Sequence, residues 1–155
     1  MKYESYDAVR VADDLSFFEF ISNGRHGKFD KRIVFQRTEV DNIYNLAFGN
    51  ISTNGKLDDY SITDNGDRNK ILATIAKAVD NYTKRYPGRS LYFKGNNQQR
   101  TRLYRMAIGL NLDELSLTYD IYARVGNEFI PFGRNLDARA FLIKRKSFNY
   151  PFTTI

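Results

Sequence analysis

Residues 84–105 read KRYPGRSLYFKGNNQQRTRLYR, and they place the end of one helix, a short strand and the start of a second helix in succession. Pro87-Gly88 ends the first helix, because proline and glycine cannot continue it favourably. Residues 90–94 are too few for anything but a strand, and Gly95 leads into a helix over about 97–110. We expect the rest of the chain to support or cover this unit.

The helix before this stretch has a clear apolar stripe. Its members recur at steps of three or four residues, which is the period of one helix face: Ile71, Ile75, Val79, Tyr82 and Tyr86. Asp64 or Asn65 can cap the start, and cations in the last turn suit the helix dipole. The pattern predicts a helix over 67–86.

The first 62 residues predict a β-meander. Strands are expected at 3–11, 15–21, 29–37, 43–52 and 56–62, with a loop at 22–28 (SNGRHGK). On the strand at 29–37, Phe29, Lys31, Ile33 and Phe35 share one face. Asn54-Gly55 predicts a two-residue type I′ turn between the last two strands, because both central residues of that turn need positive φ.

The C-terminal part predicts three more strands, at 115–125, 128–132 and 139–145, with Gly126-Asn127 as the turn between the first two. The apolar tail 147–155 is expected to pack back onto the domain. The whole pattern predicts a single α+β domain over 1–155. Its bent antiparallel sheet should carry two α-helices, 67–86 and about 97–110, packed on one face.

Composition excludes several classes of protein. With 155 residues, 42% hydrophobic and 15% aromatic, the chain suits one globular domain with a core. The absence of cysteine excludes disulfides, zinc–thiolate sites and cysteine nucleophiles. No apolar run is long enough to span a membrane, and residues 1–10 lack the apolar core of a signal peptide. We therefore expect a cytoplasmic protein without a membrane partner.

Charge is distributed unevenly along the chain. Residues 1–67 hold 8 basic and 12 acidic side chains, whereas residues 68–155 hold 16 and 6, a net charge of +10. Such asymmetry favours a polyanionic partner, although a solvated basic surface is the simpler alternative. The residues expected to bind nucleic acid or another anion on one continuous surface are Lys84, Arg85, Arg89, Lys94, Arg100, Arg102, Tyr104 and Arg105.

Arg100 differs from its neighbours, because it falls on the apolar arc of the second predicted helix while Arg102 and Arg105 face away. A lone buried charge is costly, so a buried ion pair with Asp58, Asp59 or Asp67 is expected. The alternative is an anion-binding arginine at the floor of a groove. Lys94-Gly95 could cradle an anion before the helix start, or it could simply form a turn.

Evidence for catalysis or metal binding is weak in the sequence. His26 lies between cations in a loop and could act as an acid or base on phosphate esters, but a lone histidine in such a loop favours a surface role. Turn and cap roles account for Asp58, Asp59, Asp64 and Asp67 without a metal. We therefore expect no metal and no cofactor.

Several stretches resemble an uncharacterised family of small bacterial proteins, known as a domain of unknown function. They are YNLAFG (44–49), Asp58-Asp59, KILATI (70–75) and RTRLYR (100–105). The resemblance implies no activity and transfers no catalytic residue. Three hypotheses stay open: a non-enzymatic module for RNA or single-stranded DNA, a small toxin-like ribonuclease, and a module that binds an acidic protein partner.

Overall fold

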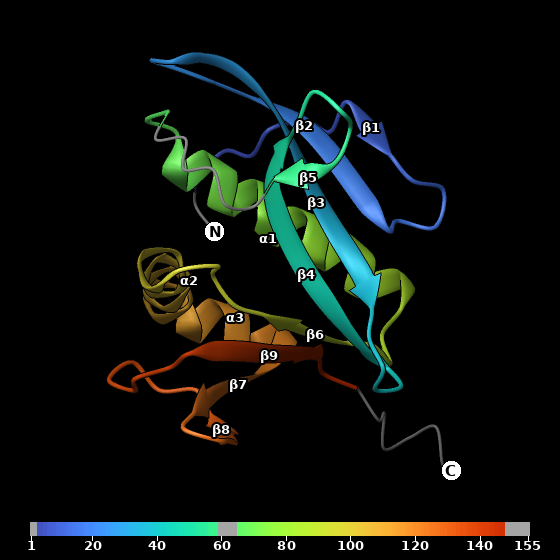
Figure 1. Ribbon diagram of the computed structural model, residues 1–155. Helices are drawn as coiled ribbons and strands as arrows, with labels where there is room; N and C mark the ends of the chain where they lie inside the picture. Colours follow the sequence, from blue (N-terminus) through green and yellow to red (C-terminus); the bar gives the residue numbers. More distant parts are fainter. Residues whose placement is uncertain (1–2, 59–64, 148–155) are drawn as a thin grey trace.

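A computed structural model describes residues 3–58 and 65–147 of the chain (Figure 1). Within these described residues, one nine-stranded sheet runs through both halves of the sequence, in the order β1-β2-β3-β4-β6-β9-β7-β8, with β5 paired to β4. The predicted α+β class is therefore confirmed. The sheet is open, and its two halves meet where β4 lies beside β6.

The N-terminal half is the predicted meander. Its strands β1 (Arg10–Val11), β2 (Phe17–Gly24), β3 (Gly27–Arg37) and β4 (Ile43–Ile51) pair antiparallel with their sequence neighbours. A short β5 (Leu57–Asp58) pairs back onto the end of β4. The remainder of the strand expected to 62 lies outside the described residues.

The Asn54-Gly55 hairpin is present, but its turn is longer than predicted. Ser52 and Lys56 are the last paired residues, because Ser52 N donates to the Lys56 carbonyl oxygen at 2.8 Å. Gly55 has a positive φ of 79°, whereas Asn54 does not. A three-residue loop of this kind needs one left-handed residue at its end, and Gly55 supplies it.

Two other N-terminal expectations were wrong. Residues 3–9 form no strand; the Tyr6 backbone N donates to Thr74 Oγ1 at 2.8 Å, so this segment lies along the first helix. Residues 22–28 form no open loop either, since the β2–β3 ladder continues to the pair Gly24–Gly27 and leaves Arg25 and His26 as a two-residue turn. Polar composition predicted a loop, but contacts from distant residues hold these positions in the sheet.

The unit around residues 84–105 forms as predicted. Helix α1 (Arg68–Arg85) is followed by strand β6 (Ser90–Phe93) and helix α2 (Gln98–Leu110). Asn97 caps α2, because its side chain accepts a hydrogen bond from Arg100 N at 2.8 Å. Gly95 is needed at the junction: a Cβ there would lie 2.3 Å from Thr101 N.

A third helix was missed. Residues 112–118 form α3 (Leu112–Thr118), and the predicted strand begins only at Tyr119. Asp113 and Glu114 occupy its first turn, where acidic side chains suit the helix dipole. A leucine pattern this short fits both periods, so alternation alone could not decide. Strands β7 (Tyr119–Val125), β8 (Glu128–Pro131) and β9 (Ala140–Arg145) follow, with the Gly126-Asn127 turn confirmed.

The sheet is mixed rather than wholly antiparallel. Strand β6 runs parallel to β4, with residues 43–45 opposite residues 90–92, and α1 is the crossover between them. Parallel strands need such a crossover, and α1 is long enough to provide it. Strand β6 then pairs antiparallel with β9, which pairs antiparallel with β7.

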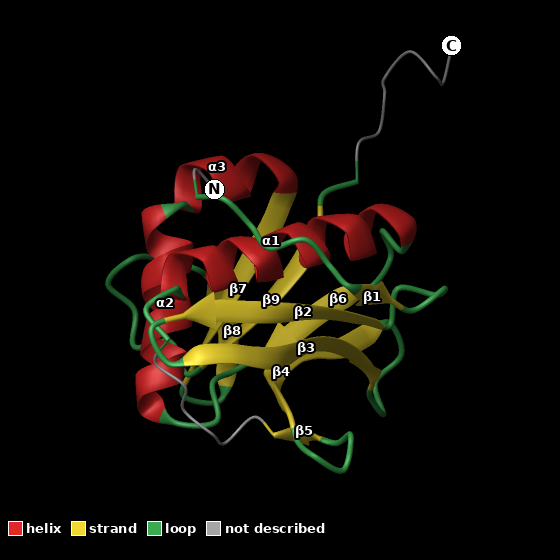
Figure 2. Cartoon of the chain, turned by 90° about the horizontal axis from the view of Figure 1, so that it is seen from above, coloured by secondary structure: helices red, strands yellow, loops and turns green. Residues whose placement is uncertain are grey.

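The helices cover one face of the sheet. Figure 2 shows α1 and α3 on the same side, with α2 beside them at the left edge. Aromatic rings fill the layer between: Phe35 stacks on Tyr82 of α1 at 3.9 Å between centroids, and Phe93 stacks on Phe141 at 5.2 Å. Tyr82, Phe20, Phe141, Ile33 and Leu91 are almost completely buried. The predicted C-terminal tail, from residue 148 onward, lies outside the described residues.

Candidate anion-binding groove

A groove of about 490 Å³ lies where α1 and α2 begin, beside the inner faces of β3 and β4. Both helix starts face it because β6 carries the chain from the far end of α1 back to this end (Figure 1). Four cations and one carboxylate lie among the described residues of its wall: Lys31, Arg68, Arg100, Arg102 and Asp67. Apolar side chains of both helices complete the wall.

Lys31 is the most unusual member of this wall. It lies in the middle of β3 on the face that turns toward the helices, and its side chain is only 5% exposed. Its Nζ lies 5.8 Å from the ring centres of Phe29 and Phe48. Burial lowers the pKa of Lys31, the Asp67 carboxylate opposes that shift, and the Arg100 charge adds to it. An anion that enters the groove would stabilise the charged form of this amine.

Arg100 is half-buried and lies against the sheet, as its place on the helix wheel predicted. Its Nη1 donates to the carbonyl oxygen of Phe48 on β4 at 3.4 Å. The side chain is less buried than expected, because it lines the groove rather than the core. Of the three acids proposed as partners, Asp59 lies outside the described residues. An ion pair with Asp58 or Asp67 stays a prediction.

Asp67 is fixed at the start of α1 by two hydroxyl groups. Its Oδ2 accepts hydrogen bonds from the Tyr6 hydroxyl and from Ser22 Oγ, each at 2.5 Å. Burial raises the pKa of Tyr6, and the hydrogen bond to Asp67 raises it further, so the phenol remains a donor. Asp67 thus joins the N-terminal segment, β2 and α1 at one end of the groove.

Asn65 completes this junction and is 2% exposed. Its Nδ2 donates to Ser22 Oγ at 3.2 Å and to the Gly27 carbonyl oxygen at 2.9 Å. Its Oδ1 accepts from His26 N at 2.7 Å, and its backbone oxygen accepts from Arg25 N at 3.2 Å. Four hydrogen bonds from one residue therefore clamp the β2–β3 turn to the start of α1.

The residues predicted to bind an anion fall into two groups at opposite ends of β6. Lys84, Arg85 and Arg89 lie where α1 ends, whereas Lys94, Arg100, Arg102, Tyr104 and Arg105 lie where α2 begins. Four residues of strand separate the groups by about 13 Å. The residues therefore form two groups along one strand, and a single continuous surface stays a prediction.

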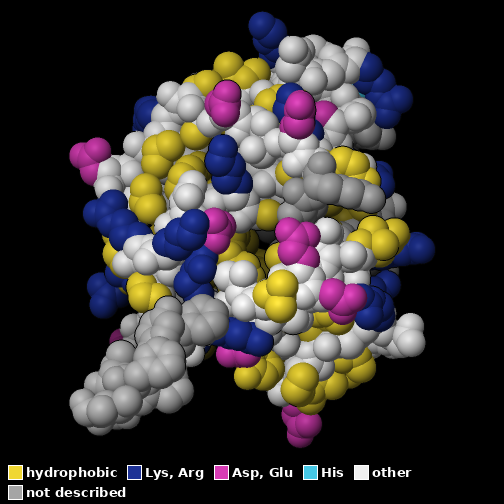
Figure 3. All heavy atoms as spheres, turned by 180° about the vertical axis from the view of Figure 1, so that it is seen from behind, with side chains coloured by type: hydrophobic (Ala, Val, Ile, Leu, Met, Phe, Trp, Pro, Cys, Tyr) yellow, Lys and Arg dark blue, Asp and Glu magenta, His cyan; other side chains and the backbone are white. Residues whose placement is uncertain are grey.

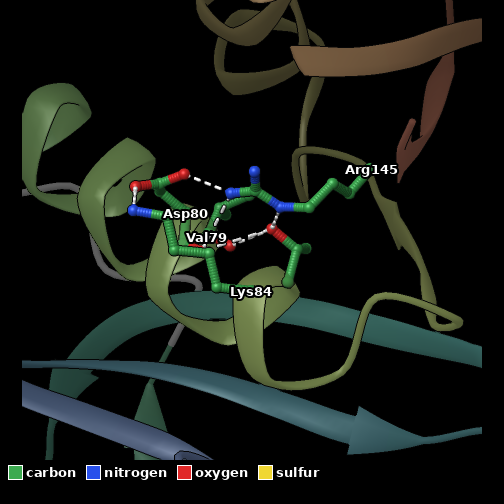
Figure 4. Close-up of polar contacts among 5 residues, drawn as sticks. Val79, Asp80, Lys84 and Arg145 are labelled. Carbon is green, nitrogen blue, oxygen red and sulfur yellow. Dashed lines mark hydrogen bonds and ion pairs between the residues drawn. The ribbon is translucent and has the colours of Figure 1, made fainter. Parts of the chain in front are cut away.

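The group at the end of α1 is held by internal contacts. Lys84 Nζ lies 3.0 Å from Asp80 Oδ2, and the Arg145 guanidinium contacts the other oxygen of that carboxylate (Figure 4). Arg85 donates to the Asp13 carbonyl oxygen at 2.6 Å. The Arg89 guanidinium lies 3.8 Å from the ring centre of Tyr86 and 4.2 Å from that of Tyr44. These cations stabilise the fold where they lie.

The group near α2 is more open to solvent. Lys94 and Arg102 are exposed, and neither contacts a partner among the described residues. Arg105 lies 3.8 Å from Asp137 Oδ1, and Tyr104 packs edge-on against Phe93 with 5.7 Å between ring centres. Gly95 N donates to Thr101 Oγ1 at 3.1 Å, so this backbone N–H is already bonded within the fold. Within this group, Arg102 is the exposed cation that lines the groove.

Sequence reasoning named Asp67 as a partner of Arg100 but missed Lys31, Arg68 and Asn65 as residues of this groove. A signal for Lys31 was present, since it shares its strand face with Phe29, Ile33 and Phe35. A lysine in a row of apolar residues is a candidate for a functional buried amine. Nothing comparable marked Asn65, whose partners are about 40 residues away in sequence.

Other sequence candidates lie apart from the groove. His26 is exposed at the tip of the β2–β3 turn and is absent from the groove wall. Within residues 3–58 and 65–147, no three His, Asp or Glu side chains gather closely enough to hold a metal ion. Over the same residues, no helix has the length and apolar character needed to cross a membrane.

Comparison with known proteins gives one match. A family model described as "Family of unknown function (DUF6934)" matches residues 2–146 of the 155-residue chain. No curated protein and no solved structure matches.

Proposed function

The chain belongs to DUF6934, a family of unknown function, and we propose that it is a non-enzymatic, cytoplasmic module that binds a polyanion, with single-stranded RNA or DNA as the ligand. The observation that supports this proposal is the charge of the groove. Its described wall holds four cations against one carboxylate. A wall of that composition attracts phosphate groups and repels cationic ligands.

The four cations of the groove differ in how they can contact a nucleic-acid strand. Arg68 and Arg102 are exposed on opposite helices and can reach phosphates that lie across the mouth of the groove. Arg100 and Lys31 lie deeper, where the dielectric constant is lower and a charged hydrogen bond is stronger. Planar guanidinium groups bind phosphate oxygens bidentately, so the three arginines suit a phosphodiester backbone.

The volume of the groove also suits a single strand of nucleic acid. A volume of about 490 Å³ is within the range of small-molecule sites and exceeds what one phosphate group fills. Lys94 is exposed just before α2 and extends the positive surface beyond the groove. A nucleic-acid backbone that runs from Arg68 to Arg102 would therefore meet the positive charge of Lys94 where it leaves the groove.

The test is fluorescence anisotropy with a labelled single strand at several salt concentrations. The variants are Arg68→Ala and Arg102→Ala. Each should weaken binding and reduce the slope of log affinity against log salt by about 0.7, because a single strand releases about 0.7 counterion per phosphate contact. Thermal stability should remain nearly unchanged, since exposed charges contribute little to folding.

Matched controls are Lys77→Ala and Arg139→Ala. Lys77 is exposed on α1 outside the groove wall, and Arg139 is an exposed cation that pairs with Asp137. Both controls should bind the strand as the parent does. Absence of binding at low salt, or equal losses in groove and control variants, would refute the proposal and favour an acidic protein partner. Cleavage of the strand during the assay would instead indicate a nuclease.

A further inference from the structure

A second, wholly different cavity lies behind the groove. It has a volume of about 110 Å³ and is lined by residues of helices α1, α2 and α3 and of the inner face of the sheet. Figure 3 shows the helix-covered face of the molecule, with a hollow near its centre and hydrophobic side chains at the edge. The lining is apolar: Leu46, Phe48, Leu72, Ile75, Ala76, Val79, Phe93, Tyr104, Ala107, Ile108, Leu115, Tyr119, Ile121 and Ile143.

The Tyr119 hydroxyl does not make this cavity polar. The Tyr119 hydroxyl interacts with Thr83 and Asp80, so its ring alone turns toward the space. Apolar space of roughly this size favours small apolar guests, such as benzene, over water. Water has no hydrogen-bond partners in such a cavity, whereas a hydrocarbon gains dispersion contacts with every wall.

The cavity and the anion-binding groove are neighbours. Four side chains line both spaces: Phe48, Leu72, Ile75 and Tyr104. On the groove side of these shared residues lie the cations Lys31 and Arg100. A ligand that passed between Leu72 and Tyr104 would therefore leave a positive environment and enter an apolar one.

We infer that the cavity and the groove together bind a small anionic amphiphile, with a carboxylate or phosphate head beside Arg100 and a short unbranched hydrocarbon chain in the cavity. The positive charge of Arg100 favours an anionic head group, and the apolar lining of the cavity favours a hydrocarbon tail. This inference goes beyond nucleic-acid binding, because a strand has no hydrocarbon segment that would fill the cavity. Since Arg100 serves both ligands, the amphiphile should also compete with a strand.

The test is isothermal titration calorimetry of the full chain with a series of carboxylates: acetate, butyrate, hexanoate and octanoate. Each methylene that enters the cavity should strengthen binding about fourfold, because burial of a CH₂ group contributes a nearly constant free energy. The gain should level off once the cavity of about 110 Å³ is full. Octyl phosphate, compared with octanoate, distinguishes the two kinds of head.

Three variants locate the ligand. Ala107→Phe fills the cavity from α2 and should weaken octanoate at least tenfold while leaving acetate unchanged. Arg100→Gln should weaken octanoate about tenfold but have little effect on neutral 1-octanol. Leu110→Phe is the control, because Leu110 is 82% exposed on the same helix. If Ala107→Phe does not fold, as judged by circular dichroism, Ala76→Leu fills the same cavity from α1.

The outcomes separate the two proposals. Ala107→Phe should keep strand binding, since Ala107 is outside the groove wall. Affinity that does not increase from acetate to octanoate, or that Ala107→Phe leaves unchanged, would overturn the amphiphile site whatever the strand does. Octanol that binds as tightly as octanoate would overturn the role of Arg100. If Arg68→Ala loses nucleic-acid binding but keeps octanoate binding, the amphiphile site is supported independently of the nucleic-acid site.

Discussion

Replacement of Gly24 by alanine should destabilise the protein strongly, although glycine-to-alanine changes are often mild. An alanine Cβ at position 24 would lie 1.9 Å from the backbone oxygen of Asn65 and 2.9 Å from its Cγ. Both atoms belong to a residue held by four hydrogen bonds, so neither can move without breaking the junction. Forcing extra volume into a packed site costs about 1–3 kcal/mol.

The lost hydrogen bonds add to that cost. If the shift of Asn65 breaks one or two of its four bonds, each contributes about 0.5–1.5 kcal/mol. The expected loss in the free energy of unfolding is therefore about 3 kcal/mol, a large part of the stability of a domain this size. Urea unfolding followed by circular dichroism measures it, with the slope against denaturant unchanged if unfolding stays two-state.

Gly88→Ala is the matched control. A Cβ at Gly88 meets nothing within 4 Å, and this glycine does not have a positive φ. Its replacement should be neutral or stabilise by about 0.4–1 kcal/mol, because the unfolded chain loses freedom. A loss below about 1 kcal/mol for Gly24→Ala, or an equal loss at Gly88, would refute the reasoning about the Asn65 junction.

Three further predictions concern stability. Burial raises the pKa of Asp80, but Lys84 and Arg145 lower it more, so the folded-state pKa is below the usual 3.8. The stability that this carboxylate contributes is fully present above pH 3.8 and is lost as pH falls through the folded-state pKa. The melting temperature of Asp80→Asn should therefore fall less in acid than that of the parent. Tyr82→Ala should cost about 3–5 kcal/mol in chemical denaturation because the ring is 1% exposed, whereas Tyr82→Phe removes the acceptor of Arg89 Nη1 and should cost about 1 kcal/mol. Burial lowers the pKa of Lys31 in the folded protein, so the unfolded state binds more protons between the folded-state pKa and the usual 10.5. Lys31→Met should therefore be at least as stable as the parent at neutral pH, and the difference should shrink as pH rises. A less stable variant would show that the charged amine stabilises the fold.

The elements that sequence could predict are those with long, regular patterns. Helix α1, the meander and the Gly126-Asn127 turn follow from periodicity and turn chemistry alone. The seven residues of α3 were too few to distinguish a helix from a strand. The parallel pairing of β4 with β6 depends on how α1 packs across the sheet, which no local pattern records.

The site was predicted less well than the fold, for a related reason. Closeness in sequence suggested that Lys84 and Arg102 share a surface, but β6 carries the chain away from the end of α1 before α2 begins. Arg100 was placed correctly because helix periodicity alone decides which way it faces. Lys31 lies near Arg100 only because of the sheet topology, so the sequence alone could not bring these two residues together.

The parallel pairing of β4 with β6 also bears on the order in which the chain folds. Residues 43–45 meet residues 90–92 across a gap of more than 40 positions, so this ladder raises the contact order and must wait for α1. The hairpins of the meander have no such delay, because closing short loops is fast. A nascent chain that ends before Ser90 therefore leaves residues 43–45 of β4 without their β6 partners. Such an unpaired edge invites association with other chains, and β6 in turn presents an unpaired edge until β9 is synthesised and pairs with it.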